Sequence, residues 1–84
     1  MSANLYAICN NTDTYIGLQL ASVNCQLAFT SHELSQALEN IYTRADVVII
    51  NNSLAKENAG ILKKYHENNK KILFITIPDP QEVV

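Results

Sequence analysis

The chain has 84 residues, of which 48% are hydrophobic, and this length accommodates one domain with a single core. Six basic and eight acidic residues leave a net charge of -2, too little positive charge for a surface that follows nucleic-acid phosphates. The longest apolar run, residues 72–77, is far shorter than the roughly 20 residues of a membrane-spanning helix, and no signal-peptide pattern is present. These features predict one cytoplasmic domain over residues 1–84, without a nucleic-acid partner and without membrane insertion.

Strand-like and helix-like stretches alternate along the sequence. Apolar runs typical of strands cover residues 5–9, 25–29, 47–50 and 72–77. A first helix is expected over residues 14–21, after a polar loop at 10–13. Thr30 and Glu33 form a capping box that predicts the start of a second helix, with this inward stripe: Leu34, Ala37, Leu38, Ile41 and Tyr42.

The third helix is expected to begin at a cap formed by Asn52 or Ser53 and to point its lysines outward. Its predicted inward residues are Leu54, Ala55, Ile61, Leu62 and Tyr65. The last strand follows and is stopped by Pro78 and Pro80.

The order β-α-β-α-β-α-β predicts an α/β fold with a small, doubly wound, four-stranded parallel sheet, the receiver- or flavodoxin-like half-fold. Right-handed crossovers favour the strand order 2-1-3-4. In this order the first helix covers one face alone, while the second and third helices share the opposite face. We therefore expect one face of the sheet to be only half covered.

The last strand predicts where a partner would bind. Its side chains are mostly apolar on both faces, although the helices can shield only one face fully. We expect a groove between the first helix and this strand that accepts a partner helix or a missing C-terminal helix. Its floor is assigned to Leu73, Ile75 and Ile77, and its wall to Tyr15 and Leu18.

Cys9 and Cys25 are predicted to be reduced, buried thiols on adjacent strands. An alternative interpretation starts from Cys9 and the polar loop after it, which resemble the phosphocysteine IIB-type subunits of sugar phosphotransferase systems. That loop lacks the glycine that lets the backbone approach a phosphate, and Asp13 would repel the phosphate.

Other chemistry finds little support in the sequence. A receiver domain needs carboxylates where this chain has Asn10 and Asn51, so only a pseudo-receiver signalling domain remains as an alternative. Gly17 and Gly60 lie within helical stretches rather than in a phosphate loop. We predict no catalytic, cofactor-binding or metal-binding residues, surface positions for the histidines, and capping or turn positions for the asparagines. The residues concerned are His32, His66, Asn10, Asn11, Asn51, Asn52, Asn68 and Asn69.

Residues 10–23, NNTDTYIGLQLASV, resemble the opening motif of the F subunit of V-type and A-type ATPases. That family has a Gly-Asp loop, then Asp-Thr, then a helix of the form Gly-Phe-Arg-Leu-Ala-Gly. The matching positions are Asp13, Thr14, Gly17, Leu18, Leu20 and Ala21. The loop glycine is replaced around Asn10 and Asn11, the arginine by Gln19 and the last glycine by Ser22.

The second half extends the resemblance. Residues 45–65 and 71–80 resemble the family's later strand and helix and its following strand, which ends in Ile-Pro. Leu54, Ala55, Ile77 and Pro78 match, and Asn52 stands in place of a glutamate. Family members continue into a further helix, so we expect this chain to be either a truncated or a naturally short form.

The resemblance implies a non-catalytic subunit of the central rotor stalk. Such a protein binds the coiled coil of the D subunit of the stalk and turns with it between the ATP-hydrolysing head and the membrane ring. ATP and the transported ion, whether proton or sodium, are then handled by other subunits. The chain would be cytoplasmic and held at the membrane through the complex.

Overall fold

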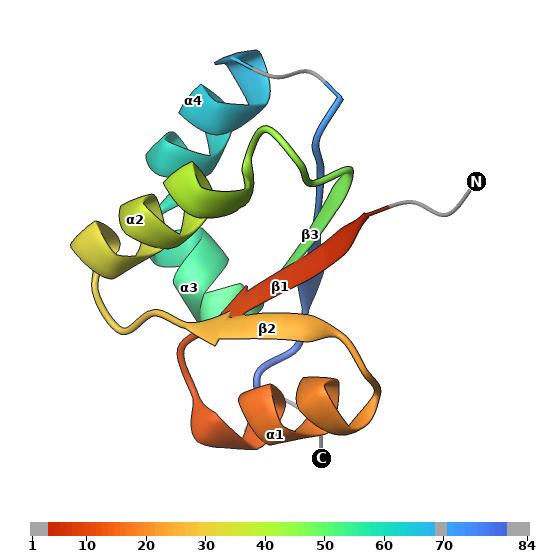
Figure 1. Ribbon diagram of the computed structural model, residues 1–84. Helices are drawn as coiled ribbons and strands as arrows, with labels where there is room; N and C mark the ends of the chain where they lie inside the picture. Colours follow the sequence, from red (N-terminus) through yellow and green to blue (C-terminus); the bar gives the residue numbers. More distant parts are fainter. Residues whose placement is uncertain (1–3, 69–70, 81–84) are drawn as a thin grey trace.

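Helices cover both faces of a central parallel sheet in the structure, a computed structural model that describes residues 4–68 and 71–80 (Figure 1). The sheet has four strands in the order β2-β1-β3-β4, which confirms the predicted α/β fold and strand order. The elements are β1 (Leu5–Cys9), α1 (Thr12–Leu20), β2 (Asn24–Leu27), α2 (Ser31–Ile41), β3 (Val47–Asn51), α3 (Asn52–Glu57), α4 (Ala59–Asn68) and β4 (Leu73–Ile77).

The two faces of the sheet are covered unequally. The main core lies between the sheet and α2, α3 and α4, and its fully buried members include Ile8, Leu38 and Ile50. A smaller cluster of Ala7, Cys9 and Cys25 lies beneath α1 on the opposite face. Figure 1 shows α1 alone on its side of the sheet, as the strand order predicted.

Helix α1 begins at Thr12, two residues earlier than predicted. The reason is a side-chain cap, because Asn11 Oδ1 accepts a hydrogen bond of 2.7 Å from the Thr14 amide. Residues 12 and 13 therefore belong to the helix rather than to the preceding loop.

Strand β2 ends at Leu27, two residues before the predicted end, because Phe29 is engaged by the next helix. The Thr30 hydroxyl caps α2 by accepting from the Glu33 amide at 3.1 Å. The Glu33 carboxylate reaches back to the Phe29 amide at 2.8 Å, one residue before the cap. The capping box is thus confirmed, and it withdraws Phe29 from the strand.

The predicted third helix is interrupted and forms two helices, α3 and α4, that meet at Asn58. The Asn58 side chain is buried, donates to the Leu54 carbonyl at 2.9 Å and accepts from the Ser31 hydroxyl at 2.6 Å. These bonds stabilise a non-helical backbone at Asn58. The inward positions predicted for this region are buried or partly buried, and Lys56, Lys63 and Lys64 are exposed.

Neither Asn52 nor Ser53 caps α3. The N-cap residue is Asn51, whose side chain makes no cap bond, and the Ser53 amide donates instead to the carboxylate of Asp79 at 3.1 Å. A cap from such a distant residue leaves no local sequence pattern.

Strand β4 begins at Leu73, one residue later than predicted, after the buried Ile72.

The end of α1 carries a backbone strain that can be tested. Ser22 has a positive φ of 64°, its amide donates to the Gln19 carbonyl at 3.0 Å, and the Val23 amide donates to the Leu18 carbonyl at 2.9 Å. This is a Schellman motif, whose left-handed position favours glycine.

We predict that Ser22→Gly raises the free energy of unfolding by about 1 kcal/mol, because glycine avoids the steric cost of the left-handed conformation. Urea titration followed by circular dichroism measures the change. The control Gln36→Gly, at an exposed position inside α2, is expected to lower stability by about 1 kcal/mol. If Ser22→Gly instead lowers the free energy of unfolding, the left-handed backbone of Ser22 does not strain the folded chain.

Candidate partner-binding surface

The predicted floor residues lie on edge strand β4, on the face of the sheet that α1 covers only in part. Parallel register pairs Ile75 with Ile49, and Ile49 contacts the small cluster beneath α1. Leu73 and Ile75 are 56% and 43% exposed, and Ile77 is partly buried. Large aliphatic side chains are therefore accessible on this strand.

The predicted wall residues lie on the same face of the sheet. Tyr15 and Leu18 are partly buried and pack against the cluster of Ala7, Cys9 and Cys25, while the Tyr15 hydroxyl accepts from Gln19 Nε2 at 2.8 Å. Ile49 contacts the same cluster from β3. The predicted wall and floor therefore lie on one face of the sheet.

Three residues that the sequence pattern did not single out, Leu5, Val47 and Ile49, extend this surface. Leu5 pairs in register with Val47, which pairs with Leu73, so all three lie in one row across the sheet. Leu5 is 40% exposed. We call the combined surface the open apolar face; its residues are Leu5, Val47, Ile49, Leu73, Ile75 and Ile77.

The sequence carried a signal for this extension. Alternate residues of a strand share a face, so Leu5, Val47 and Ile49 could have been assigned to the face of Leu73 once the register was known. The register itself depends on tertiary pairing.

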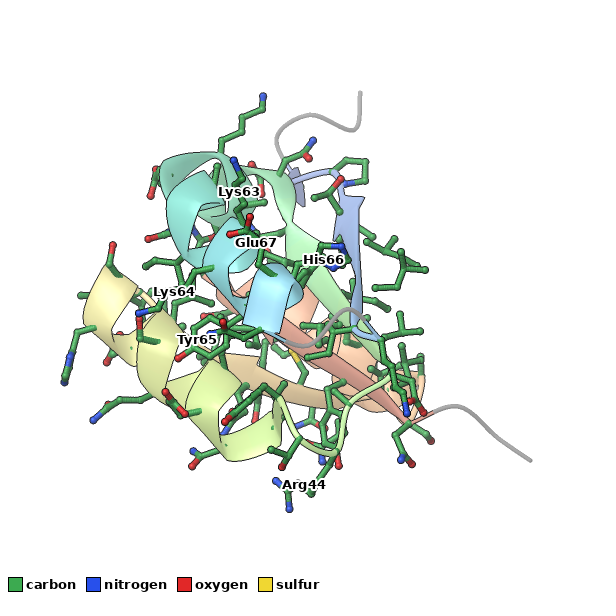
Figure 2. The ribbon with its side chains drawn as sticks, turned by 90° about the horizontal axis from the view of Figure 1, so that it is seen from above. Arg44, Lys63, Lys64, Tyr65, His66 and Glu67 are labelled. Carbon is green, nitrogen blue, oxygen red and sulfur yellow. The ribbon has the colours of Figure 1, made fainter. Side chains whose placement is uncertain are left out.

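Two cavities in the described part of the chain lie away from the open apolar face. One of about 650 Å³ separates α2 from α4 and is lined mainly by polar residues with Ile61 and Tyr65. The Tyr65 hydroxyl donates to Glu39 Oε1 at 2.9 Å, and burial together with this carboxylate raises the pKa of Tyr65 to about 12. Figure 2 shows Tyr65 directed toward α2 and His66 directed toward β4. The other cavity, of about 430 Å³, lies beside Tyr6 and Arg44.

A polar network occupies the carboxyl edge of the sheet, where a receiver domain holds its carboxylates. Asn51 is fully buried and donates from Nδ2 to Asn10 Oδ1 at 2.7 Å and also to Asp79, while its Oδ1 accepts from the Asn10 amide at 3.0 Å. Ser53 joins through its hydroxyl. Every buried polar side-chain atom among the described residues has a partner. The network therefore ties the ends of β1 and β3 to the segment after β4.

The two thiols do not fit a phosphate acceptor. Cys9 and Cys25 are buried, free cysteines on adjacent strands with their sulfurs 3.4 Å apart, which confirms the predicted placement. Burial raises the pKa of Cys9, and burial together with the neighbouring Cys9 raises the pKa of Cys25 to about 12. Cys9 Sγ faces the Asn11 carbonyl at 3.6 Å, an acceptor where a phosphate would need donors.

The other predicted side chains occupy ordinary positions. His32 and His66 are exposed, and His66 Nδ1 lies 3.0 Å from the Ile72 carbonyl. No group of three or more His, Cys, Asp or Glu side chains suited to a metal is found in residues 4–68 and 71–80. Asn11 caps α1, Asn10 and Asn51 join the network, Asn68 ends α4, and Asn69 lies outside the described residues.

Among residues 4–68 and 71–80, no helix has the length and apolar character needed to cross a membrane.

A family model described as ATP synthase (F/14-kDa) subunit matches residues 5–84. The chain belongs to this family. It is therefore a subunit of a V-type or A-type ATPase, as the motifs at residues 10–23 and 71–80 indicated. No match to a curated protein sequence was found. The F-subunit family is an accessory part of the ATPase.

The carboxyl-edge network of this F-family chain gives a stability prediction. Asp79→Ala removes the carboxylate that accepts from Asn51 and the Ser53 amide, so we expect a loss of about 1.5 to 3 kcal/mol in the free energy of unfolding. Asp79→Asn keeps an acceptor oxygen and should lose less. Urea titration compares the three proteins, and an unchanged Asp79→Ala would show that the network does not stabilise the fold.

The thiols give a pH prediction. Because the folded pKa of Cys25 is about 12, above the roughly 8.5 of an unfolded thiol, its contribution to stability is complete below pH 8 and is lost as pH rises toward 12. Iodoacetamide at pH 8 should label Cys25 at least about 100-fold more slowly in the folded protein than in urea, since few folded Cys25 thiols are ionised, and it should also label Cys9 more slowly. Mass spectrometry counts the labels, and rapid labelling of the folded chain would refute this account.

Proposed function

We propose that this chain is the F subunit of the central rotor stalk of a V-type or A-type ATPase and that it binds the coiled coil of the D subunit through the open apolar face. As a stalk component it is non-catalytic and turns with the D subunit between the ATP-hydrolysing head and the membrane ring. It is cytoplasmic and reaches the membrane through the complex.

The exposure of Leu73 and Ile75 is the observation that carries this proposal. Both side chains lie on a sheet face beside a partly buried row, so a partner can remove them from water together. Burying one aliphatic side chain of this size contributes about 1.5 to 3 kcal/mol. Contiguous exposed apolar surfaces mark protein interfaces, and a coiled coil presents apolar side chains in a row.

The neighbouring helix supports the same site. Tyr15 and Leu18 of α1 pack against the same small cluster as Ile49 of the open apolar face. A partner helix placed over β3 and β4 would therefore lie beside α1 and complete the cover of this face. Because α2, α3 and α4 lie on the opposite face, they leave this approach unobstructed.

We predict that Ile75→Asp weakens binding to the D subunit by tenfold or more, because a charge replaces an aliphatic side chain at the proposed contact. The fold should persist, since Ile75 is 43% exposed in the free chain. A binding titration against the purified D subunit measures the affinity, and circular dichroism checks the fold.

Lys63→Asp is the matched control, because it introduces the same side chain at an exposed position of α4 on the opposite face. Its affinity for the D subunit is expected to remain unchanged. Equal affinities for folded Ile75→Asp and the unsubstituted chain would place the docking surface elsewhere.

A further inference from the structure

The outer edge of β4 presents backbone groups that no other described strand pairs with. β4 is the last strand of the sheet, and the Leu73 amide donates inward to the Asp46 carbonyl at 2.9 Å. Backbone groups of successive strand residues point to opposite edges, so the N–H and C=O groups of Phe74 and Thr76 face outward. These four groups form a template for another strand.

This edge also lacks the usual protection against pairing. Its residues are Leu-Phe-Ile-Thr-Ile, with no charged side chain and no proline within the strand. The opposite edge strand, β2, is shorter and carries the polar side chains of Asn24 and Gln26. Edges are normally blunted by charges, prolines or bulges, so β4 is the edge suited to receive a strand.

The sequence of β4 is complementary to itself. When two copies run antiparallel about Ile75, Phe74 of each lies opposite Thr76 of the other, and the outward N–H and C=O groups match. Leu73 then lies opposite Ile77 on the same face, so apolar side chains meet apolar side chains. At the ends of the segment Lys71 comes opposite Asp79, so the pairing brings no like charges together.

We propose that the outer edge of β4 pairs antiparallel with β4 of a second copy of this chain, which joins the two sheets into one continuous sheet. The pairing uses the edge of the strand, whereas the proposed stalk contact uses its face. It therefore does not depend on the identity of the stalk partner, and the two sites can be tested separately.

The test is the oligomeric state of the free chain and of Thr76→Pro, measured by light scattering on a sizing column over a range of concentrations. The unsubstituted chain should approach twice its monomer mass as concentration rises. Thr76→Pro should stay monomeric, because it removes an outward N–H that the internal sheet does not use. Thr76→Val retains the N–H and should behave like the unsubstituted chain.

A cross-link gives a second readout that does not require the proline variant to fold. Ile75 lies at the two-fold centre as a non-hydrogen-bonded pair, where opposed side chains approach most closely. Under a mild oxidant, two Ile75→Cys thiols should each lose one hydrogen to the oxidant and form an intermolecular disulfide. Lys63→Cys should not form this dimer.

A chain that remains monomeric up to its solubility limit, or a folded Thr76→Pro that still dimerises, would overturn the proposal. Thr76→Pro should also retain its affinity for the D subunit, since the Thr76 backbone lies outside the proposed face contact. If Thr76→Pro no longer dimerises but still binds the D subunit, the result supports edge pairing as a contact separate from stalk binding. If the unsubstituted chain dimerises but does not bind the D subunit, only the proposed function is refuted.

Discussion

The pairing of β1 with β3 determines how the sheet of this F-family chain is covered. β2 adds to one side of β1, whereas β3 and then β4 add to the other, so the direction of winding reverses after the first unit. Right-handed crossovers consequently send α1 to one face and α2, α3 and α4 to the opposite face. One short helix cannot cover four strands. The exposed aliphatic residues on β4 follow from this topology, and so does the main core on the other face.

Polar contacts at the carboxyl edge hold the strand ends together. Asn51 is buried there and bonds to the loop after β1 and to Asp79 after β4. Amides can donate and accept at once, so two of them satisfy each other where two carboxylates would repel. The same position in a receiver domain would need an acidic acceptor. Here the groups are matched to one another, which is the pattern of a structural network.

The buried thiols of Cys9 and Cys25 contribute to packing beneath α1. Cys9 and Cys25 fill the space beneath α1 together with Ala7, and their environment disfavours the thiolate. A nucleophilic cysteine needs exposure and nearby positive charge or donors. Both thiols are buried beneath α1, so they act as small apolar side chains that allow the helix to lie close to the sheet.

The sequence by itself determined the alternation of strands and helices, the strand order, the Thr30–Glu33 cap and the family motifs around residues 10–23. The periodicity and the cap are set by residues close together in the sequence. The strand order follows from the right-handed crossover of each strand-helix-strand unit. Only the tertiary structure decided the cap of α3 by Asp79, the break at Asn58 and the row that joins Leu5 to Leu73. Each depends on a partner distant along the chain, and such contacts exist only after the strands have taken their register.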